Sequence, residues 1–283
     1  MGMRVIQRIG EMQSWSEGER RQRCRVALVP TMGFLHEGHL RLVRAGRERS
    51  DRVVVSIFVN PMQFTPQEDF DAYPRDFERD CRLLENEGVN VVFHPPVEEI
   101  YPEGFQTHID VERLSAPLCG AFRSGHFRGV ATVVAKLFNA VRPHVAIFGC
   151  KDYQQLQVVR CMVKDLNYGI EIYGHPIVRE PDGLALSSRN AYLDGEERQA
   201  ALSLSRSLRK AELLVSQGER RGSAIVDAVA AELAKAPLAR VEYVTLCDAA
   251  SLQEISCLQG TALLALAVRI GKTRLIDNVV LET

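Results

Sequence analysis

Two histidines stand three residues apart in the segment that runs from Pro30 to His39, where a short apolar run gives way to a helical pattern. A chain that passes from a strand through a turn into a helix presents free backbone N–H groups and the positive end of the helix dipole, and both attract phosphate. His36 and His39 can face such a ligand together and donate N–H bonds to it. Gly33 and Gly38 let the backbone approach closely. The segment therefore predicts a phosphate-binding turn.

Two other interpretations of this histidine pair stay open. A His-x-x-His pair taken alone is more often a surface pair without a role. A zinc site of the metalloprotease kind needs His-Glu-x-x-His on a helix, and here the second histidine comes one residue early, with no thiolate ligand nearby. The position directly after a strand favours phosphate over both, and we predict no protein metal site.

Polar side chains also follow two other predicted strands. Asn60 and Gln63 end one strand and offer amide donors and acceptors to a polar substrate, although a plain Asn-Pro turn explains Asn60 equally well. After another strand, Lys151 can supply a cation to polyphosphate, and Asp152 can accept hydrogen bonds from ribose hydroxyls or cap the next helix.

A fourth polar segment, from Leu186 to Asn190, carries Ser187, Ser188 and Arg189. Two hydroxyls and a guanidinium can close over phosphates, while a solvated hinge loop is the plainer interpretation of this segment alone. Together, the four loops place His, Lys, Arg, Ser and Gln at one expected edge of a sheet, which is a coherent constellation for binding a nucleotide.

The elements that position these loops follow from apolar patterning. Strands rich in β-branched residues alternate with helical stripes, which is typical of a parallel sheet covered by helices on both faces, a Rossmann-like α/β fold. We predict a helix with an apolar stripe between Val130 and Val141, stopped by Pro143, and another from Leu156 to Leu166. The predicted strands are Val26 to Val29, Val53 to Val59, Val89 to Phe93 and Val145 to Phe148.

The pattern of apolar and polar residues changes after Ile177. Asp194 and Glu197 look like a capping pair that opens a helix, and a second helix is expected to end at Pro237. Three strand-like runs follow, so we predict a smaller C-terminal α+β lid domain with the boundary near residues 178–189, dividing the chain into 1–178 and 179–283. The predicted runs are Val241 to Leu246, Leu263 to Ile270 and Leu275 to Leu281.

Composition excludes several classes of function. The 283 residues carry 35 Lys and Arg against 36 Asp and Glu, so no net field favours a nucleic-acid backbone or an anionic membrane. The apolar runs are far shorter than the ~20 residues that span a bilayer. Seven scattered cysteines without a Cys-x-x-Cys pair indicate reduced thiols, and with no visible targeting signal we expect a cytoplasmic protein.

Six segments stand out between about residues 26 and 193. They are Pro30-Thr31-Met32-Gly33 with His36-Glu37-Gly38-His39, Asn60-Pro61-Met62-Gln63-Phe64, Asp71-Ala72-Tyr73-Pro74-Arg75, Gly125-His126-Phe127-Arg128-Gly129-Val130-Ala131-Thr132-Val133, Lys151-Asp152-Tyr153-Gln154-Gln155 and Ser187-Ser188-Arg189-Asn190. Together, and in this order, they resemble the pantoate–β-alanine ligase family of the nucleotidyltransferase superfamily. The last ninety residues carry little motif.

The resemblance implies that pantoate attacks ATP to form a pantoyl adenylate and pyrophosphate, and that β-alanine then attacks the adenylate and releases AMP. It also implies Mg²⁺ with ATP and a homodimer. His39 would be the catalytic acid with His36 beside it, and Lys151 and Arg189 would stabilise charge. ATP would be bound by Met32, Gly33, His36, His39, Gly149, Lys151, Asp152, Val178, Leu186, Ser187, Ser188 and Arg189, and pantoate by Gln63 and Gln155, with Gln63 also facing β-alanine. From their places at the strand ends we add Pro30 to the residues expected to bind ATP and Asn60 to those expected to bind substrate.

Two positions depart from the family's pattern. Cys150 stands where relatives usually carry Glu or Gln, and Leu186 where Met is usual. We expect both to tune ATP affinity without loss of the chemistry. Two rival functions remain: a nucleotidyltransferase that stops at adenylation, and a catalytically silent ATP-binding module, which the presence of both histidines and Lys151 disfavours.

Overall fold

The computed structural model describes residues 2–65, 68 and 70–283. Met1, the first residue of the predicted N-terminal domain, therefore lies outside the described residues. Contacts divide the chain into two compact units. The first unit comprises Met1–Ser115, Arg123–Cys150 and Gln155–Pro176, and the second comprises Ala116–Phe122, Lys151–Gln154 and Ile177–Thr283. Two short segments that precede Ile177 in the sequence thus fold with the C-terminal unit, and a functional boundary at 178/179 stays a prediction.

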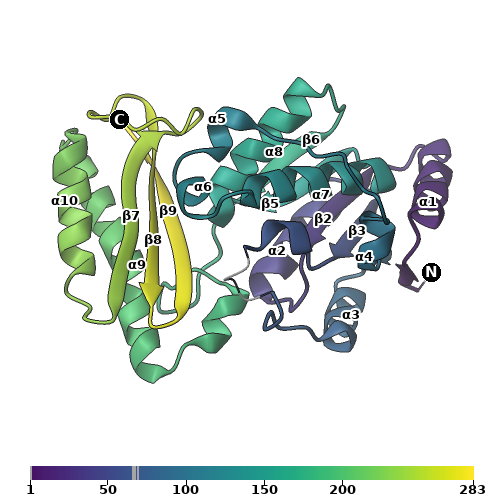
Figure 1. Cartoon of the computed structure of the whole chain (residues 1–283), viewed down its shortest axis with the longest axis horizontal. Coiled ribbons are helices and arrows are strands. Elements are labelled where there is room, and N and C mark those ends of the chain that lie inside the picture. The colour runs from purple at the N-terminus through teal and green to yellow at the C-terminus, as the bar shows by residue number, and fades with distance from the viewer. Residues whose placement is uncertain (1, 66–67, 69) are drawn as a thin grey trace. The chain divides into compact units, whose positions relative to one another are not determined.

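The first unit is built on a six-stranded, wholly parallel sheet of order β1-β4-β3-β2-β5-β6 (Figure 1). This confirms the predicted Rossmann-like sheet. β3 ends two residues before the predicted Val59, and β4 begins two residues after the predicted Val89. The strands are β1 Arg4–Ile6, β2 Val26–Thr31, β3 Arg52–Ile57, β4 Val91–Phe93, β5 Val145–Gly149 and β6 Glu171–His175.

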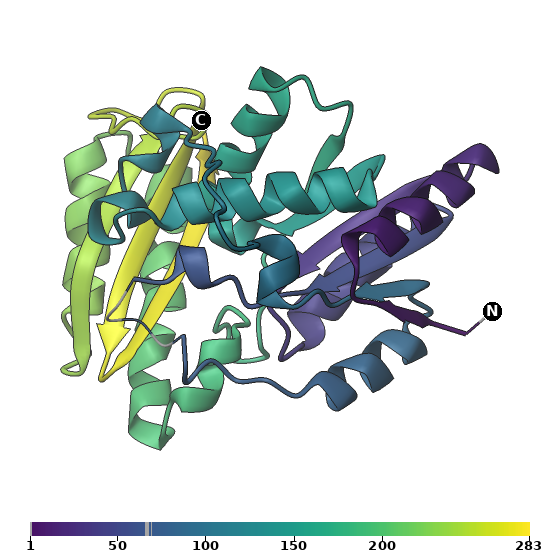
Figure 2. The ribbon, with the colours of Figure 1, turned by 45° about the vertical axis from the view of Figure 1, so that its right-hand side comes forward.

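Helices cover both faces of this sheet. α2 contacts β2, β3 and β5, and its buried Leu40, Leu42 and Val43 join one apolar core with alternate strand residues. The intervening residues Leu28 and Val54 are fully buried as well, so the opposite face is also covered. α1 and α7 contact each other and β2, and both lie over that second face (Figure 2). Burial on both faces explains why these strands read as continuous apolar runs.

The helices in this part of the chain differ widely in length. Several are single turns that lie within the connections between strands. The helices are α1 Ile9–Arg21, α2 Glu37–Arg47, α3 Phe77–Asn86, α4 Val97–Ile100, α5 Glu112–Ser115, α6 Cys119–Phe122, α7 His126–Val141 and α8 Tyr153–Asp165, with 3-10 helices η1 Pro61–Gln63 and η2 Cys150–Asp152.

The second unit is a three-stranded antiparallel sheet of β7 Ala239–Asp248, β8 Thr261–Ile270 and β9 Thr273–Glu282, in the order β7-β8-β9. Helices α9, Gly195–Ser216, and α10, Gly222–Leu233, bury their apolar sides with one face of this sheet. η3, Ser188–Tyr192, precedes α9. This is the α+β pattern that the sequence predicts.

The predicted capping pair at the start of α9 is confirmed. The Asp194 carboxylate accepts from the Glu197 N–H at 2.8 Å, and the Glu197 carboxylate accepts from the Asp194 N–H at 3.2 Å. The predicted end of the next helix at Pro237 is wrong, because α10 stops at Leu233. The remaining residues turn sharply into β7, with the Ala239 N–H donating to the Ala236 carbonyl.

No helix within the described ranges combines the length and the apolar character that crossing a bilayer requires.

Candidate active site

The turn after β2 has a backbone shape that only particular residues tolerate. Thr31 Oγ1 donates to the Ser56 carbonyl at 2.7 Å and accepts from the Gly33 N–H at 3.2 Å. Gly33 has a φ of +84° and Phe34 a φ of +49°. A Cβ on Gly33 would also lie 3.0 Å from Ile57. Glycine is therefore required here by both conformation and space.

A carboxylate that sequence reasoning missed anchors this turn. Asp80 of α3 has 1% of its surface exposed, and it accepts the backbone N–H groups of Phe34 at 2.7 Å and Leu35 at 2.8 Å. Burial raises the pKa of Asp80, while the two N–H donors act in the opposite direction. Arg79 donates to the Leu35 carbonyl at 2.9 Å. Because these contacts join residues about 45 positions apart, no local sequence pattern predicts them.

The histidine pair stands at the start of α2. This helix begins at Glu37, one residue before the predicted Gly38, with His36 as its N-cap. The two imidazole centroids are 4.1 Å apart, and the His36 backbone N–H donates to His39 Nδ1 at 3.3 Å. A ring nitrogen that accepts carries no proton, so the neutral His39 ring carries its proton on Nε2. His39 can therefore donate through Nε2 to a ligand at this helix end.

The order of the strands places this turn at the point where ligands bind in such sheets. From β2 the chain builds β3 and β4 on one side and then returns to place β5 on the other side of β2. In open parallel sheets the ligand crevice opens at the carboxyl ends of the strands on either side of such a reversal. Here these ends are Thr31 of β2 and Gly149 of β5. The turn that carries His36 and His39 follows the first of these ends, and Gly149 is the second.

Asn60 and Gln63 also fall together at the end of β3. The Asn60 amide nitrogen donates to Gln63 Oε1 and to the Gly129 carbonyl, both at 3.1 Å. Its oxygen accepts from the Met62 N–H at 3.3 Å and from the Tyr101 hydroxyl at 2.8 Å. All four hydrogen-bonding positions of this buried amide are thus taken by the protein. Asn60 orients Gln63, and direct contact with a substrate stays a prediction.

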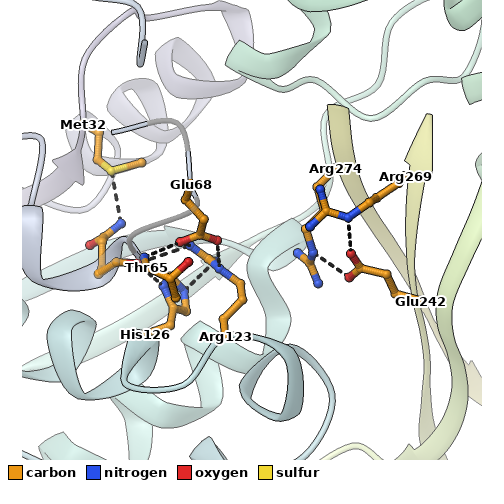
Figure 3. A network of polar contacts seen from close by, with 9 residues as sticks. Met32, Thr65, Glu68, Arg123, His126, Glu242, Arg269 and Arg274 are labelled. Atoms are coloured by element: carbon orange, nitrogen blue, oxygen red, sulfur yellow. Dashed lines mark hydrogen bonds and ion pairs between the residues drawn. The ribbon is translucent and has the colours of Figure 1, made fainter. Parts of the chain in front are cut away.

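The Gln63 side chain bridges two loops. Its amide nitrogen donates to the sulfur of Met32 at 3.1 Å, which ties the end of β3 to the turn after β2 (Figure 3). An amide nitrogen carries two N–H donors and the amide oxygen accepts two hydrogen bonds. Gln63 therefore retains one donor and one acceptor position beyond its contacts with Met32 and Asn60, as a polar substrate would need.

A charged network holds the main chain of Gln63. His126 Nδ1 lies 2.8 Å from the Gln63 carbonyl and must donate to it, because a carbonyl only accepts. Arg123 then donates to His126 Nε2 at 3.0 Å and to the same carbonyl at 3.2 Å. Arg123 also grips both oxygens of Glu68, at 2.5 and 3.1 Å (Figure 3). His126 lies in a segment that resembles the family, but sequence reasoning gave none of the three a role.

Apart from Pro30 and Gln155, the remaining predicted residues lie in the second unit, where two segments carry them. Lys151 and Asp152 lie in η2, with Lys151 half-buried and Asp152 exposed. Arg179 and Ala185 form an antiparallel bridge, and the Leu186 N–H donates to the Val178 carbonyl at 3.0 Å. This narrow hairpin turns at Gly183, whose φ is +96°.

Each predicted residue can thus be assigned to one of the two units. The segment 186–189 comes directly after the hairpin. It does not follow a strand of the parallel sheet. In the first unit lie Pro30, Met32, Gly33, His36, His39, Asn60, Gln63, Gly149 and the half-buried Gln155 of α8, and in the second lie Lys151, Asp152, Val178, Leu186, Ser187, Ser188 and Arg189.

The seven cysteines are all free thiols in this structure. Burial raises the pKa of the Cys150 thiol, although Arg160 acts in the opposite direction, so the thiol stays protonated at neutral pH. In residues 2–65, 68 and 70–283 no three His, Cys, Asp or Glu side chains gather as a set of metal ligands.

Comparison with known proteins agrees with this geometry. The chain matches the family described as Pantoate-beta-alanine ligase over residues 4–280. It is 56% identical to the pantothenate synthetase of Heliobacterium modesticaldum and 55% identical to that of Geobacter sulfurreducens. The first match covers 99% of this chain and 100% of the relative, and the second covers 99% of each.

Solved structures resemble it over the same length. A pantothenate synthetase from Thermus thermophilus superposes with a TM-score of 0.94 at 47% identity, covering 98% of this chain and 99% of that one. A pantoate–β-alanine ligase from Francisella tularensis, described in complex with beta-gamma ATP and β-alanine, superposes with a TM-score of 0.81 at 32% identity, covering 98% and 97%. By its sequence, its fold and the loops at its strand ends, the chain belongs to the pantoate–β-alanine ligase family.

Proposed function

We propose that this protein condenses pantoate with β-alanine in an ATP-dependent reaction that yields pantothenate, AMP and pyrophosphate. The observation that carries the proposal is the end-to-end similarity to pantothenate synthetases, at 56% identity over 280 residues in the case of Heliobacterium modesticaldum. The Francisella tularensis relative, described with beta-gamma ATP and β-alanine bound, supports both of these as ligands.

In the first half-reaction, a pantoate carboxylate oxygen attacks the α-phosphorus of ATP, and the bond to the bridging oxygen of pyrophosphate breaks. Negative charge gathers on the departing pyrophosphate. The start of α2 and the Nε2 donor of His39 suit this charge, with His36 beside it. Lys151 and Arg189 supply the cations in this proposal.

In the second half-reaction, the β-alanine amine attacks the acyl carbon of pantoyl adenylate. The bond to the AMP oxygen breaks, AMP leaves, and the amine loses a proton. The protein need only hold the amine against the acyl carbon. The unused donor and acceptor positions of Gln63 suit this task, and we assign pantoate to Gln63 and Gln155, with Asn60 holding Gln63 in place.

The ATP assignments extend over residues of both units. In this proposal the triphosphate lies against the turn after β2, and the ribose and adenine lie against Gly149, Asp152 and Val178. The complete set proposed for ATP is Pro30, Met32, Gly33, His36, His39, Gly149, Lys151, Asp152, Val178, Leu186, Ser187, Ser188 and Arg189.

We also propose that Mg²⁺ accompanies ATP. The described residues offer no cluster of three metal-ligating side chains, so the ion fits a role in which triphosphate oxygens supply most of its ligands. There it would neutralise charge on the triphosphate while Lys151 and Arg189 contact the remaining oxygens.

Four further proposals concern the whole protein. Residues 179–283 act as a lid over residues 1–178, the protein works as a homodimer in the cytoplasm, and nucleic acid is no partner. The charge balance of 35 basic against 36 acidic residues supports the last of these. Light scattering on the purified protein tests the dimer, since a mass equal to one chain would contradict it.

The deciding experiment measures products from ATP and pantoate, with and without β-alanine. We expect AMP, pyrophosphate and pantothenate when all three substrates are present, and only a stoichiometric amount of enzyme-bound adenylate when β-alanine is omitted. Continuous release of free pantoyl adenylate would instead indicate a nucleotidyltransferase that stops at the first step. Binding of ATP without any turnover would indicate a silent nucleotide-binding protein.

A further inference from the structure

Two consecutive residues of the last strand lie outside every motif discussed so far. Asp277 and Asn278 of β9 have only 2% and 5% of their surface exposed. Buried polar side chains of this kind need partners, because an unsatisfied one costs free energy. Their partners are the two segments of the second unit that carry the proposed ATP ligands.

Asp277 holds the hairpin that leads to residues 186–189. Both of its oxygens accept from Arg179, at 2.6 Å to Nη1 and 3.0 Å to Nη2, in the forked geometry that makes such pairs strong. Arg179 Nη1 also donates to the Gly183 carbonyl at 3.1 Å, so the guanidinium closes the turn of the same hairpin. Val178 and Leu186 directly flank this clamped bridge.

Asn278 holds the other segment. Its amide nitrogen donates to the Lys151 carbonyl at 2.9 Å, which fixes the peptide from which Lys151 and Asp152 extend. The two strand residues are also joined to each other, since the Asn278 backbone N–H donates to Asp277 Oδ1 at 2.8 Å. One continuous hydrogen-bonded path therefore runs from Arg179 through β9 to Lys151.

The geometry of a strand explains why neighbours perform two tasks. Successive side chains point to opposite faces of a sheet, and residues directly opposite on neighbouring strands share a face. Asp277 pairs with Leu266, which belongs to the core beneath α9 and α10, and Asn278 pairs with Ala265 on the other face. A single peptide unit of β9 thus connects the segments on its two faces.

We propose that Asp277 and Asn278 are positioning residues for ATP, which set the Lys151 segment and the 178–189 hairpin in a common register. The inference rests on the proposed function for its choice of ligand. Neither residue contacts the reacting atoms in this proposal. Their effect is to hold Lys151 on one side and Val178 and Leu186–Arg189 on the other at the spacing that one nucleotide requires.

The test compares isosteric variants with a matched control in the same sheet. Asp277→Asn removes the charged fork, and Asn278→Asp turns the donor toward Lys151 into an acceptor. Glu242→Gln is the control, because Glu242 of β7 accepts from Arg269 at 2.8 Å and Arg274 at 2.7 Å, and both of these partners lie outside the two segments (Figure 3). All three variants remove one buried or half-buried polar interaction of this sheet.

Three quantities are measured for each variant: the Kd of MgATP by calorimetry, the KM of each substrate, and the thermal midpoint. Asp277→Asn removes a charge-assisted pair, and Asn278→Asp sets a carboxylate against the Lys151 carbonyl, so we expect each variant to weaken ATP binding about tenfold. The KM values for pantoate and β-alanine should stay within about twofold of wild type, by the same scale. Glu242→Gln should lower the thermal midpoint and leave the Kd of MgATP unchanged.

Two results would overturn the inference. One is an unchanged Kd of MgATP in both Asp277→Asn and Asn278→Asp. The other is a Kd of MgATP that rises as much in Glu242→Gln as in these two variants when all three share the same thermal midpoint. If Asp277→Asn does not fold, Arg179→Lys replaces it, because this change leaves the strand intact and removes one arm of the fork. Arg179→Lys must then also raise the Kd of MgATP. If the wild-type protein binds ATP but makes no pantothenate, only the proposed function is contradicted. The comparison of Kd values still decides the role of Asp277 and Asn278.

Discussion

At the scale of single residues, His39 has the most sharply defined task. Its Nδ1 accepts the His36 N–H, which leaves Nε2 as the donor. Donors aimed at developing charge are typically worth about 10² to 10³ in rate. We therefore predict that His39→Ala slows adenylate formation by at least that order. Amide formation from chemically made pantoyl adenylate should fall less, because no pyrophosphate departs in that step.

Rapid-quench measurement of both half-reactions checks this prediction. His108→Ala is the matched control, since His108 is an exposed histidine outside the loops at the strand ends. An equal loss in both half-reactions for His39→Ala would show that His39 supports the turn or holds the pantoyl group, and its assignment to pyrophosphate would be wrong.

The ion pair of Glu68 and Arg123 gives a prediction about pH. Burial raises the pKa of Glu68, but hydrogen bonds from Arg123 and from the Thr65 N–H outweigh it and bring the pKa below the ordinary 4.5. A carboxyl whose pKa is lowered by folding contributes stability above its unfolded pKa and loses it as pH falls through the folded value. The pair should therefore stabilise the fold at pH 7 and lose this contribution as the pH falls from 4.5 through the lowered folded pKa.

Urea unfolding of wild type and Glu68→Gln at several pH values measures this contribution. We expect a difference of about 1 to 2 kcal/mol in the free energy of unfolding at pH 7 that shrinks as the pH falls below 4.5. Glu78→Gln serves as the control, because the Glu78 side chain is 91% exposed and should show little difference at any pH. A difference that stays constant down to pH 3 would rule out an ionised Glu68 as its source.

At the scale of elements, the contact of α7 with η1 depends on one glycine. A Cβ on Gly129 would overlap the Met62 carbonyl oxygen and lie 2.8 Å from the Gln63 nitrogen. Overpacking of this kind costs about 1 to 3 kcal/mol. Gly129→Ala should therefore lower the free energy of unfolding by that amount and raise the KM for pantoate, because Asn60 and Gln63 move with η1.

The control for this change is Gly18→Ala in α1, where a Cβ meets no described atom within 4 Å. There the better helix former should stabilise the protein by about 0.5 to 1 kcal/mol and leave the KM for pantoate unaltered. Denaturation and steady-state kinetics on both variants decide the matter. A Gly129→Ala protein with normal stability and a normal KM for pantoate would contradict the prediction. It would mean that α7 and η1 can move apart without effect on folding or on pantoate binding.

At the scale of the whole molecule, ATP binding should be visible as stability. A ligand that binds only the folded state stabilises it, by about 2.7 kcal/mol at a hundredfold excess over Kd. We expect MgATP to raise the thermal midpoint of wild type and His108→Ala alike, and His39→Ala to need more ATP for the same rise. Thermal scans across an ATP series measure this, and no shift at millimolar ATP would contradict the assignment of the ATP site.

The sequence by itself determined the features that depend on neighbours in the chain. Strands buried on both faces are recognisable as continuous apolar runs, and Asp194 and Glu197 indicate a capping box. Both patterns arise within a few residues of sequence. The turn from Gly33 to His39 is equally local, since strand, turn and helix follow one another directly. These features were enough to predict the parallel sheet, the α+β pattern of the second unit and the phosphate-binding turn.

Only the tertiary structure decided which distant residues hold those local features in place. Asp80 reaches Phe34 and Leu35, Arg123 reaches Glu68, and Asn278 reaches Lys151 across 45 to 127 positions of sequence. In the sequence each of these reads as an ordinary polar residue of a helix, loop or strand. Their partners are set by how the elements pack, and the free energy of a buried hydrogen bond depends on the burial that packing creates, which no local pattern encodes.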